Sequence, residues 1–153
     1  MAIRNIVKKG DDILKKKCRP VTEFDSRLEN LLDDMIETLK EAQGVGLAAP
    51  QVGMLKRVFI IDTEDTGLVE CINPEILETK GKSITQEGCL SVPGEWGYVE
   101  RPAIVKFKAF DRKGNEFTMV VSKLAARAIC HENDHLDGHL FDEKIIKDYE
   151  EIE

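Results

Sequence analysis

The clearest amphipathic pattern of the chain lies between residues 26 and 43. Apolar residues recur there every three or four positions, as they do on one face of a helix that packs against a core. They are Leu28, Leu31, Leu32, Met35, Ile36 and Leu39. Ser26 and Glu29 have the spacing of a capping box, and Gly44 stands where a helix commonly ends. The pattern predicts a helix over residues 26–43.

Between residues 57 and 122 the pattern changes to short runs rich in apolar and β-branched residues. Such runs, bounded by turn residues, indicate strands. They cover residues 57–62, 70–72, 75–79, 98–101, 103–110 and 116–122, and residues 111–115 (DRKGN) have the composition of a hairpin turn. A second helix is predicted over residues 123–137. Because the strands are grouped between helices, the sequence predicts an α+β fold.

The second predicted helix contains residues 131–135 (HENDH), an H-E-x-x-H motif. Side chains four residues apart lie on one face of a helix, so His131 and His135 can reach one metal ion while Glu132 leans towards a water at its open position. The same face includes Leu124 and Ala128, which is typical of a buried helix. We therefore expect β-sheets packed around a central H-E-x-x-H metal-ligand helix, with an N-terminal helix beside them.

Two histidines leave such a site one protein ligand short, because a catalytic metal usually has three protein ligands and one open position. In one family of metalloproteases a third histidine follows at a fixed spacing, but here that position is Phe141. Families that use a more distant glutamate also fit poorly, since few residues follow the motif. The third ligand should therefore lie upstream, and the chain has four cysteines to consider.

Among these cysteines, Cys89 has the context most typical of a ligand. Cys18 lies in a lysine-rich stretch, and Cys71 lies in an apolar run where a free cysteine usually packs as a small hydrophobe. Cys130 points about 100° away from His131 around the helix. Cys89 is instead preceded by residues 86–88 (QEG), a charged and glycine-containing run that is unlike a core strand. A purely structural role for Cys89 stays open at this point.

Three segments of the chain resemble the signature motifs of the peptide deformylases. Residues 44–51 (GVGLAAPQ), 87–91 (EGCLS) and 131–135 (HENDH) are similar to the family's GxGLAAPQ, EGCLS and HExDH motifs, in the same order and spacing. The similarity covers nearly the whole chain. The resemblance implies removal of the formyl group from the N-terminal formyl-methionine of newly made bacterial proteins.

The resemblance also implies roles for individual residues. It makes Cys89, His131 and His135 the metal ligands. Glu132 would take a proton from water and later give it to the departing amine, as a general base and acid does. Gln51 and the backbone N–H of Leu90 would stabilise the oxyanion. The implied metal is iron(II) in the cell, and zinc, nickel or cobalt suits the same ligand types. An ordinary loop position is the alternative for Gln51.

Four further residues are assigned to substrate binding. The resemblance implies that the backbone of Val45 and Gly46 pairs with an extended peptide as an added strand would. Val45, Leu90 and Ala128 would line an apolar slot for the methionine side chain, which is flexible and polarisable. Gly88, which lacks a side chain, would let another backbone approach.

Asp134 has no ligand role in this scheme. A carboxylate at this position can orient a metal-binding histidine or pair with a cation such as Arg101. A solvated helix aspartate is the alternative.

Composition and charge limit the number of domains, the class of partner and the cellular compartment that we expect. At 153 residues we expect one catalytic domain over residues 1–153, and the formal net charge of −7 argues against a general nucleic-acid binder. No apolar run approaches a membrane span, and residues 1–17 lack the hydrophobic region of a signal peptide. Cysteines without scaffold-like spacing fit a reducing compartment. We expect a cytoplasmic monomer that does not bind membranes.

The expected partners are N-formyl-methionyl peptides and nascent chains, with the ribosome as a further candidate. Some deformylases carry a longer basic C-terminal helix that docks on the ribosome. The end of this chain, residues 148–153, is short and acidic, which argues against that mode of docking.

Two other interpretations fit the H-E-x-x-H helix. A zinc peptidase would use the same helix and would cleave unformylated peptides. A non-catalytic protein could hold a structural metal with cysteine and histidine. Structural sites are closed by four protein ligands, and only three can be named here, which favours the enzyme.

Overall fold

The computed structural model describes residues 2–147 and residue 149. Two α-helices are present in this part of the chain, α1 (Ser26–Ala42) and α2 (Lys123–Leu136). The strands are β1 (Gly46–Ala48), β2 (Val58–Thr63), β3 (Gly67–Lys80), β4 (Ser83–Cys89), β5 (Val92–Arg101), β6 (Ile104–Phe110) and β7 (Glu116–Ser122). Short 3-10 helices lie at Asp12–Lys15, Ala49–Val52 and Phe141–Lys144.

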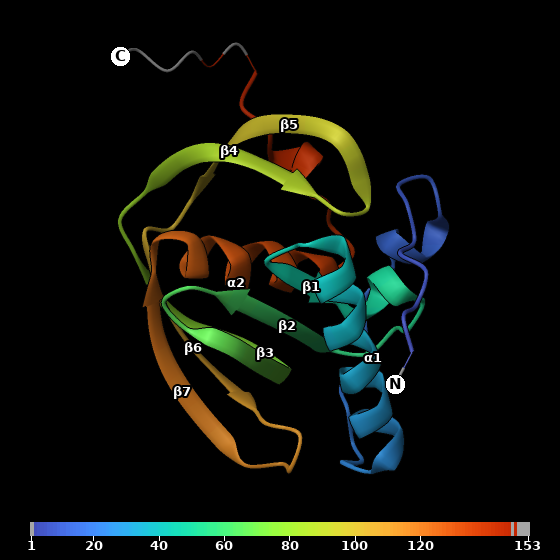
Figure 1. The fold of residues 1–153 in the computed structure, drawn as a ribbon. Coiled ribbons are helices and arrows are strands. Elements are labelled where there is room, and N and C mark those ends of the chain that lie inside the picture. The colour runs from blue at the N-terminus through green and yellow to red at the C-terminus, as the bar shows by residue number, and fades with distance from the viewer. Residues whose placement is uncertain (1, 148, 150–153) are drawn as a thin grey trace.

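The strands form two antiparallel sheets, one on each side of α2. The larger sheet has the order β1-β2-β3-β6-β7, and the smaller sheet is the β4-β5 hairpin. Figure 1 shows α2 between them, with α1 beside the larger sheet. The apolar face of α2 packs on Phe59, Ile61 and Phe107 of the larger sheet. The predicted α+β fold, with sheets around the H-E-x-x-H helix, is confirmed.

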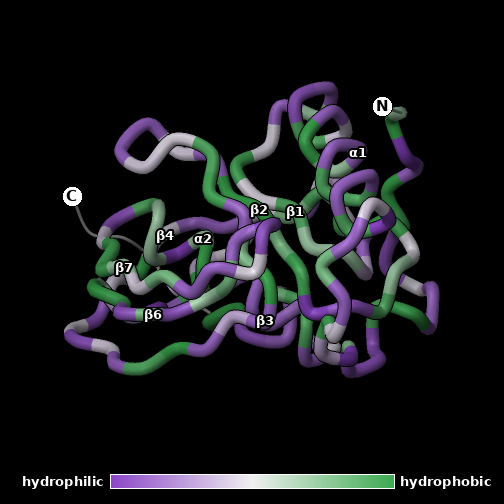
Figure 2. The backbone as a smooth tube through the Cα atoms, turned by 90° about the horizontal axis from the view of Figure 1, so that it is seen from below, coloured by the Kyte–Doolittle hydropathy of each residue, from purple (hydrophilic) through white to green (hydrophobic). Residues whose placement is uncertain are grey.

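Helix α1 forms where its apolar periodicity predicted it, but its ends differ from the prediction. Asp25 is the N-cap, and its side chain accepts a hydrogen bond from the Leu28 N–H at 3.1 Å, so Ser26 is already helical. At the other end the helix stops one residue earlier than predicted, and Gln43 is its C-cap in the left-handed conformation (φ 55°). Hydrophobic and hydrophilic segments alternate along α1 in Figure 2, as an amphipathic helix requires.

Two strands were missed by the sequence patterns. They are β1, which has only three residues, and β4, which is mostly polar and has a glutamate and a glycine just before Cys89. The two runs predicted over 70–72 and 75–79 belong to one strand, β3, with shifts in its pairing to β6. The position of β4 matters most, because Cys89 is its last residue.

Among the described residues, no helix has both the length and the apolar character needed to cross a membrane. Of the acidic end used to argue about ribosome docking, all but residue 149 lies outside the described residues.

Candidate metal centre and active site

Three side chains with metal-binding atoms meet between α2 and the end of β4. Cys89 Sγ and ring nitrogens of His131 and His135 all lie within 4.8 Å of one another. The histidines are one helical turn apart on α2 and almost fully buried, whereas Cys89 is half-buried. The structure therefore brings together the three residues predicted as ligands, although 42 positions separate Cys89 from His131 in the sequence.

The separations and the donor types fit one divalent metal ion. Cys89 Sγ lies 3.4 Å from His135 Nε2. Ligands that share a tetrahedral ion at bond lengths of about 2.0–2.3 Å lie about 3.3–3.8 Å from one another. One thiolate and two imidazoles form a donor set that borderline-soft divalent metals accept. Beside these ligands, Glu132 Oε1 is buried and has no hydrogen-bond partner among the described residues.

Glu87 fixes the orientation of the His131 ring. Its Oε1 lies 2.7 Å from His131 Nδ1, so Nδ1–H donates to the carboxylate and Nε2 is left for a metal. The arrangement at His135 is different. His135 Nε2 faces Cys89, while Nδ1 is buried without a hydrogen-bond partner among the described residues. Within the described part of the chain, a carboxylate therefore aligns His131 but not His135.

Two arginines hold Glu87 in turn. Arg101, on β5, donates from Nε and Nη2 at 3.0 and 2.8 Å, and Arg127, on α2, donates from Nη1 at 2.5 Å. Arg127 also donates to the backbone carbonyls of Ser83 and Val99, one on each strand of the hairpin. This cluster ties the β4-β5 hairpin to α2, and so it holds Cys89 next to the histidines.

Asp134 joins the same network from the other side. Arg101 Nη1 donates to Asp134 Oδ2 at 2.6 Å, and Lys144 Nζ lies 3.1 Å from the same oxygen. The expected pairing of Asp134 with Arg101 is confirmed, and the solvated alternative is wrong.

Burial and ion pairs shift the pKa values of these groups in different directions. At Glu87 the cost of burial is outweighed by hydrogen bonds from His131 and Arg101, which hold the pKa of that carboxyl well below its usual range. Burial raises the pKa of Glu132 to about 7. Burial also lowers the pKa of His135 well below its ordinary value, which favours the neutral imidazole that binds metals.

Gly46 lies against the Glu132 carboxylate. A Cβ at position 46 would come within 2.5 Å of Glu132 Oε2. The absence of a side chain therefore makes room for Glu132, a reason that the sequence did not reveal. Gly46 belongs to β1, an edge strand that pairs with β2 and with no other strand among the described residues. Its other edge has the backbone groups that an extended peptide could pair with.

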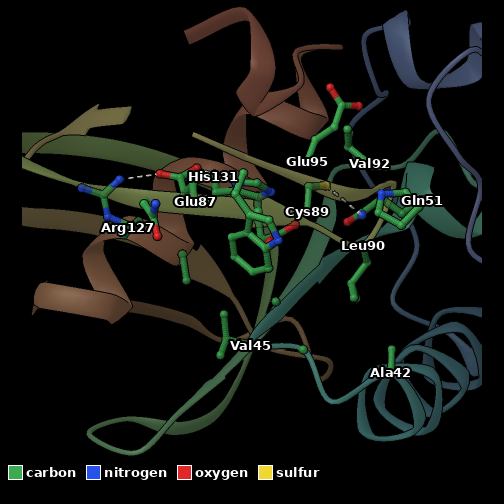
Figure 3. Close-up of a pocket in the computed structure, with 18 of the residues that line it drawn as sticks. Ala42, Val45, Gln51, Glu87, Cys89, Leu90, Val92, Glu95, Arg127 and His131 are labelled. Atoms are coloured by element: carbon green, nitrogen blue, oxygen red, sulfur yellow. Dashed lines mark hydrogen bonds and ion pairs between the residues drawn. The ribbon is translucent and has the colours of Figure 1, made fainter. Parts of the chain in front are cut away.

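Gln51 lies in the short helix Ala49–Val52 and is almost fully buried. Its Oε1 accepts a hydrogen bond from the Ala48 N–H at 2.9 Å. Its Nε2 donates to Ser91 Oγ at 3.0 Å and lies 3.7 Å from Cys89 Sγ, a contact drawn as a dashed line in Figure 3. The Gln51 amide is thus held at the end of β4, next to the predicted ligand and to Leu90.

A cavity of about 500 Å³ opens beside these groups, between the hairpin, α2 and the segment that follows α1 (Figure 3). The predicted site residues that line it are Val45, Gly46, Gln51, Gly88, Cys89, Leu90, Ala128, His131 and Glu132. Only His135 of the predicted set is absent from the lining. Leu124, which the helix pattern placed on the buried face, is half exposed and contributes to the cavity wall.

Trp96, which the sequence patterns did not single out, also shapes this cavity. A Cβ at Gly88 would come within 2.6 Å of Trp96 Cζ3, so Gly88 admits an indole ring rather than the backbone we expected. The Trp96 side chain lines the cavity and is 69% exposed. One available signal was that the only tryptophan of the chain lies in a polar, glycine-rich run, where a core position is unusual.

Comparison with known proteins finds matches along nearly the whole chain. The family model described as polypeptide deformylase matches residues 3–151. Peptide deformylase 1 of Clostridium acetobutylicum is 57% identical over 95% of this chain and 96% of that protein. The peptide deformylase of Caldicellulosiruptor bescii is 55% identical over 100% of this chain and 93% of that protein.

Solved structures agree with the sequence matches. The crystal structure of the Thermotoga maritima peptide deformylase superposes with a TM-score of 0.93 at 40% identity, covering 95% of this chain and 99% of that one. A Synechococcus elongatus peptide deformylase in complex with actinonin gives 0.91 at 38% identity, over 95% of this chain and 80% of that one. The chain therefore belongs to the polypeptide deformylase family, enzymes that remove the N-formyl group from nascent peptides.

Proposed function

We propose that this chain hydrolyses the formamide of N-formyl-methionyl peptides at a divalent metal held by Cys89, His131 and His135. The observation that carries the proposal is the meeting of the three ligand atoms, within 4.8 Å of one another, beside a buried carboxylate and a cavity. Iron(II) is the metal we propose for the cell. Zinc, nickel and cobalt are replacements that the same ligands would accept.

Glu132 is the general base and then the general acid in this proposal. When bound, the metal supplies Lewis acidity, which makes a water more acidic and polarises a carbonyl. Glu132 takes the proton from the attacking water and later gives it to the departing amine nitrogen. The products are formate and a peptide with a free amino terminus. The position of the Glu132 carboxylate, next to the ligands but not among them, supports this role.

Gln51 and Leu90 are the proposed donors to the oxyanion that develops on the formyl oxygen. Donors held in place before the reaction stabilise such a charge without the cost of reorganisation. Gln51 meets this requirement because its amide is buried and hydrogen-bonded at both ends. Leu90 lines the same cavity and follows Cys89, so its backbone N–H is the second donor.

The peptide substrate would lie along the free edge of β1, next to Val45 and Gly46. The methionine side chain of the substrate would enter the cavity between Leu90 and Ala128. Gly88 and the Trp96 indole would form another part of the wall. We propose that residues 1–153 act as one catalytic domain and as a monomer in the cytoplasm. Nascent chains are the natural substrates, and the ribosome is a candidate partner.

The test combines metal analysis with a deformylation assay on protein purified without oxygen. Elemental analysis should find about one iron per chain, and a formyl-methionyl peptide should be deformylated while its unformylated form stays intact. Glu132→Ala should keep its metal, because Glu132 is not a ligand, and lose about 10²–10⁴-fold in turnover. Near-normal turnover of the metal-loaded variant would remove Glu132 from the mechanism. Cleavage of an internal bond in the unformylated peptide would favour a peptidase.

A further inference from the structure

Ser91 is a fully buried serine to which the scheme above assigns no role of its own. It lies in the turn between β4 and β5, two residues after Cys89. Its Oγ accepts a hydrogen bond from Gln51 Nε2 at 3.0 Å, across 40 positions of the sequence. Its backbone carbonyl accepts one from the Lys9 N–H at 2.7 Å. The turn is thus held on two sides, and one of the contacts ends on the proposed oxyanion donor.

The hydrogen bonds of Gln51 determine which way its amide faces. Oε1 accepts from the Ala48 N–H at 2.9 Å. If the amide were rotated by half a turn, Nε2 would face that N–H and two donors would oppose each other. Nε2 therefore points towards the hairpin turn. Of its two hydrogens, one is donated to Ser91 Oγ, and the second points to the side of the cavity, where Nε2 makes a long hydrogen bond of 3.7 Å to Cys89 Sγ.

We infer that Ser91 is a positioning residue for deformylation. Its hydroxyl holds one Nε2–H of Gln51, and this keeps the other N–H on the cavity side beside Cys89, where the formyl oxygen of a bound substrate would accept from it. Leu90 lies between Cys89 and Ser91, and the Gln51 amide contacts the side chains of both neighbours. The Ser91 hydroxyl therefore also sets the position of the Gln51 amide relative to the Leu90 N–H. The inference rests on the oxyanion role proposed for Gln51.

Such a role predicts a particular kinetic signature. Loss of a whole oxyanion donor costs about 10²–10³-fold in kcat, so a donor that is present but loosely held should cost less. Ser91→Ala removes one oxygen atom from a buried position and adds no bulk. We expect the variant to fold and keep its metal, with kcat lowered roughly 10- to 100-fold and KM changed little. A serine needed only for packing would lower thermal stability and leave the turnover of the folded enzyme unchanged.

A double-mutant cycle on the metal-loaded enzyme tests the inference. Ser91→Ala, Gln51→Ala and the double variant are compared, with metal content and melting temperature recorded for each. If Ser91 acts through Gln51, its substitution should change kcat less than about threefold once Gln51 is gone. A full effect in both backgrounds, or normal turnover of Ser91→Ala, would overturn the inference. Normal turnover of Gln51→Ala would instead contradict the proposed oxyanion role.

Two further variants keep the result interpretable. Ser91→Cys keeps the shape of the side chain with a larger terminal atom and replaces the hydroxyl with a weaker acceptor, so its kcat should fall between those of Ser91→Ala and the unmodified enzyme. This variant also serves if Ser91→Ala folds poorly, and a kcat equal to that of the unmodified enzyme would count against the inference. Ser26→Ala, at the start of α1 and away from the cavity, is the matched control and should leave kcat unchanged.

Discussion

Helix α2 and the β4-β5 hairpin both contribute to the metal centre, but they do so by different physical means. The helix carries His131, Glu132 and His135 within five residues, and the helical repeat alone brings the two histidines to one face. The hairpin contributes Cys89 from the end of a strand. No local rule places that thiol beside the helix. Its position depends on contacts between segments that are distant in the sequence.

The charged cluster around Glu87 provides those contacts. Glu87 on β4 binds His131 and Arg127 of α2 together with Arg101 of β5, and all four side chains are buried. Buried ion pairs of this kind add little net stability compared with apolar packing, but breaking one leaves charges without partners. We therefore expect single substitutions to disturb the position of the β4-β5 hairpin more than the folding of helix α2.

Removal of the hairpin's ligand should have the largest effect. Cys89→Ser replaces a thiolate with a hydroxyl, a harder and much weaker ligand for these metals, so metal and activity should be lost together. Elemental analysis and the deformylation assay measure both. Cys18→Ala is the control, because Cys18 is buried away from the ligands and should leave metal content and turnover nearly intact. Full metal occupancy in Cys89→Ser would show that the helix needs no ligand from the hairpin.

The second largest effect is expected when Glu87, which links the hairpin to α2, is replaced. Glu87→Ala leaves the buried Arg101 and Arg127 without their shared carboxylate, and we expect a loss of about 3–5 kcal/mol in the free energy of unfolding, measured by chemical denaturation. Metal affinity should also fall, by roughly 10- to 100-fold, because His131 loses the group that orients it.

Glu100→Ala is the matched control for this prediction. Glu100 is an exposed glutamate on β5 of the same hairpin, and its removal should change stability by less than about 0.5 kcal/mol. A similar stability for Glu87→Ala and Glu100→Ala would mean that the cluster does not hold the hairpin to α2.

The smallest effect is expected where the helix meets β1. Gly46→Ala would place a Cβ about 2.5 Å from Glu132 Oε2, so the carboxylate must move. We expect a cost of about 1–3 kcal/mol in stability and a lower kcat, with the metal retained. The cost should largely disappear when the same change is made in Glu132→Ala, since that variant lacks the clashing carboxylate. An equal cost in both backgrounds would indicate strain in the β1 backbone instead.

The elements that could be predicted from sequence share one property, namely that local spacing determines them. The apolar periodicity of α1, the hairpin of β6 and β7 and the ligand helix were all predicted close to their observed bounds. The three motifs also identified the family correctly. The capping of α1 was predicted less well, because Asp25 and Ser26 are both good N-cap residues and only the backbone decides between them.

The features that could not be predicted depend on burial of polar or charged groups. Strand β4 was missed because Glu87 looks like a surface residue in the sequence, and its partners Arg101 and Arg127 lie 14 and 40 positions away. The sequence also did not show why positions 46 and 88 are glycine. Gly46 makes room for the side chain of Glu132, and Gly88 makes room for that of Trp96.

By itself, the sequence determined the composition of the metal centre and the chemistry that it can support. Short-range geometry is enough to interpret the spacing of the histidines and the strand-rich region between two helices, and the resemblance of the motif around Cys89 to the family's motif added the third ligand. Only the tertiary structure decided how Cys89, Gln51 and Ser91 meet α2 and each other. The physical reason is that buried charges and amides are stable only when every partner is supplied, and the fold supplies those partners from several distant segments.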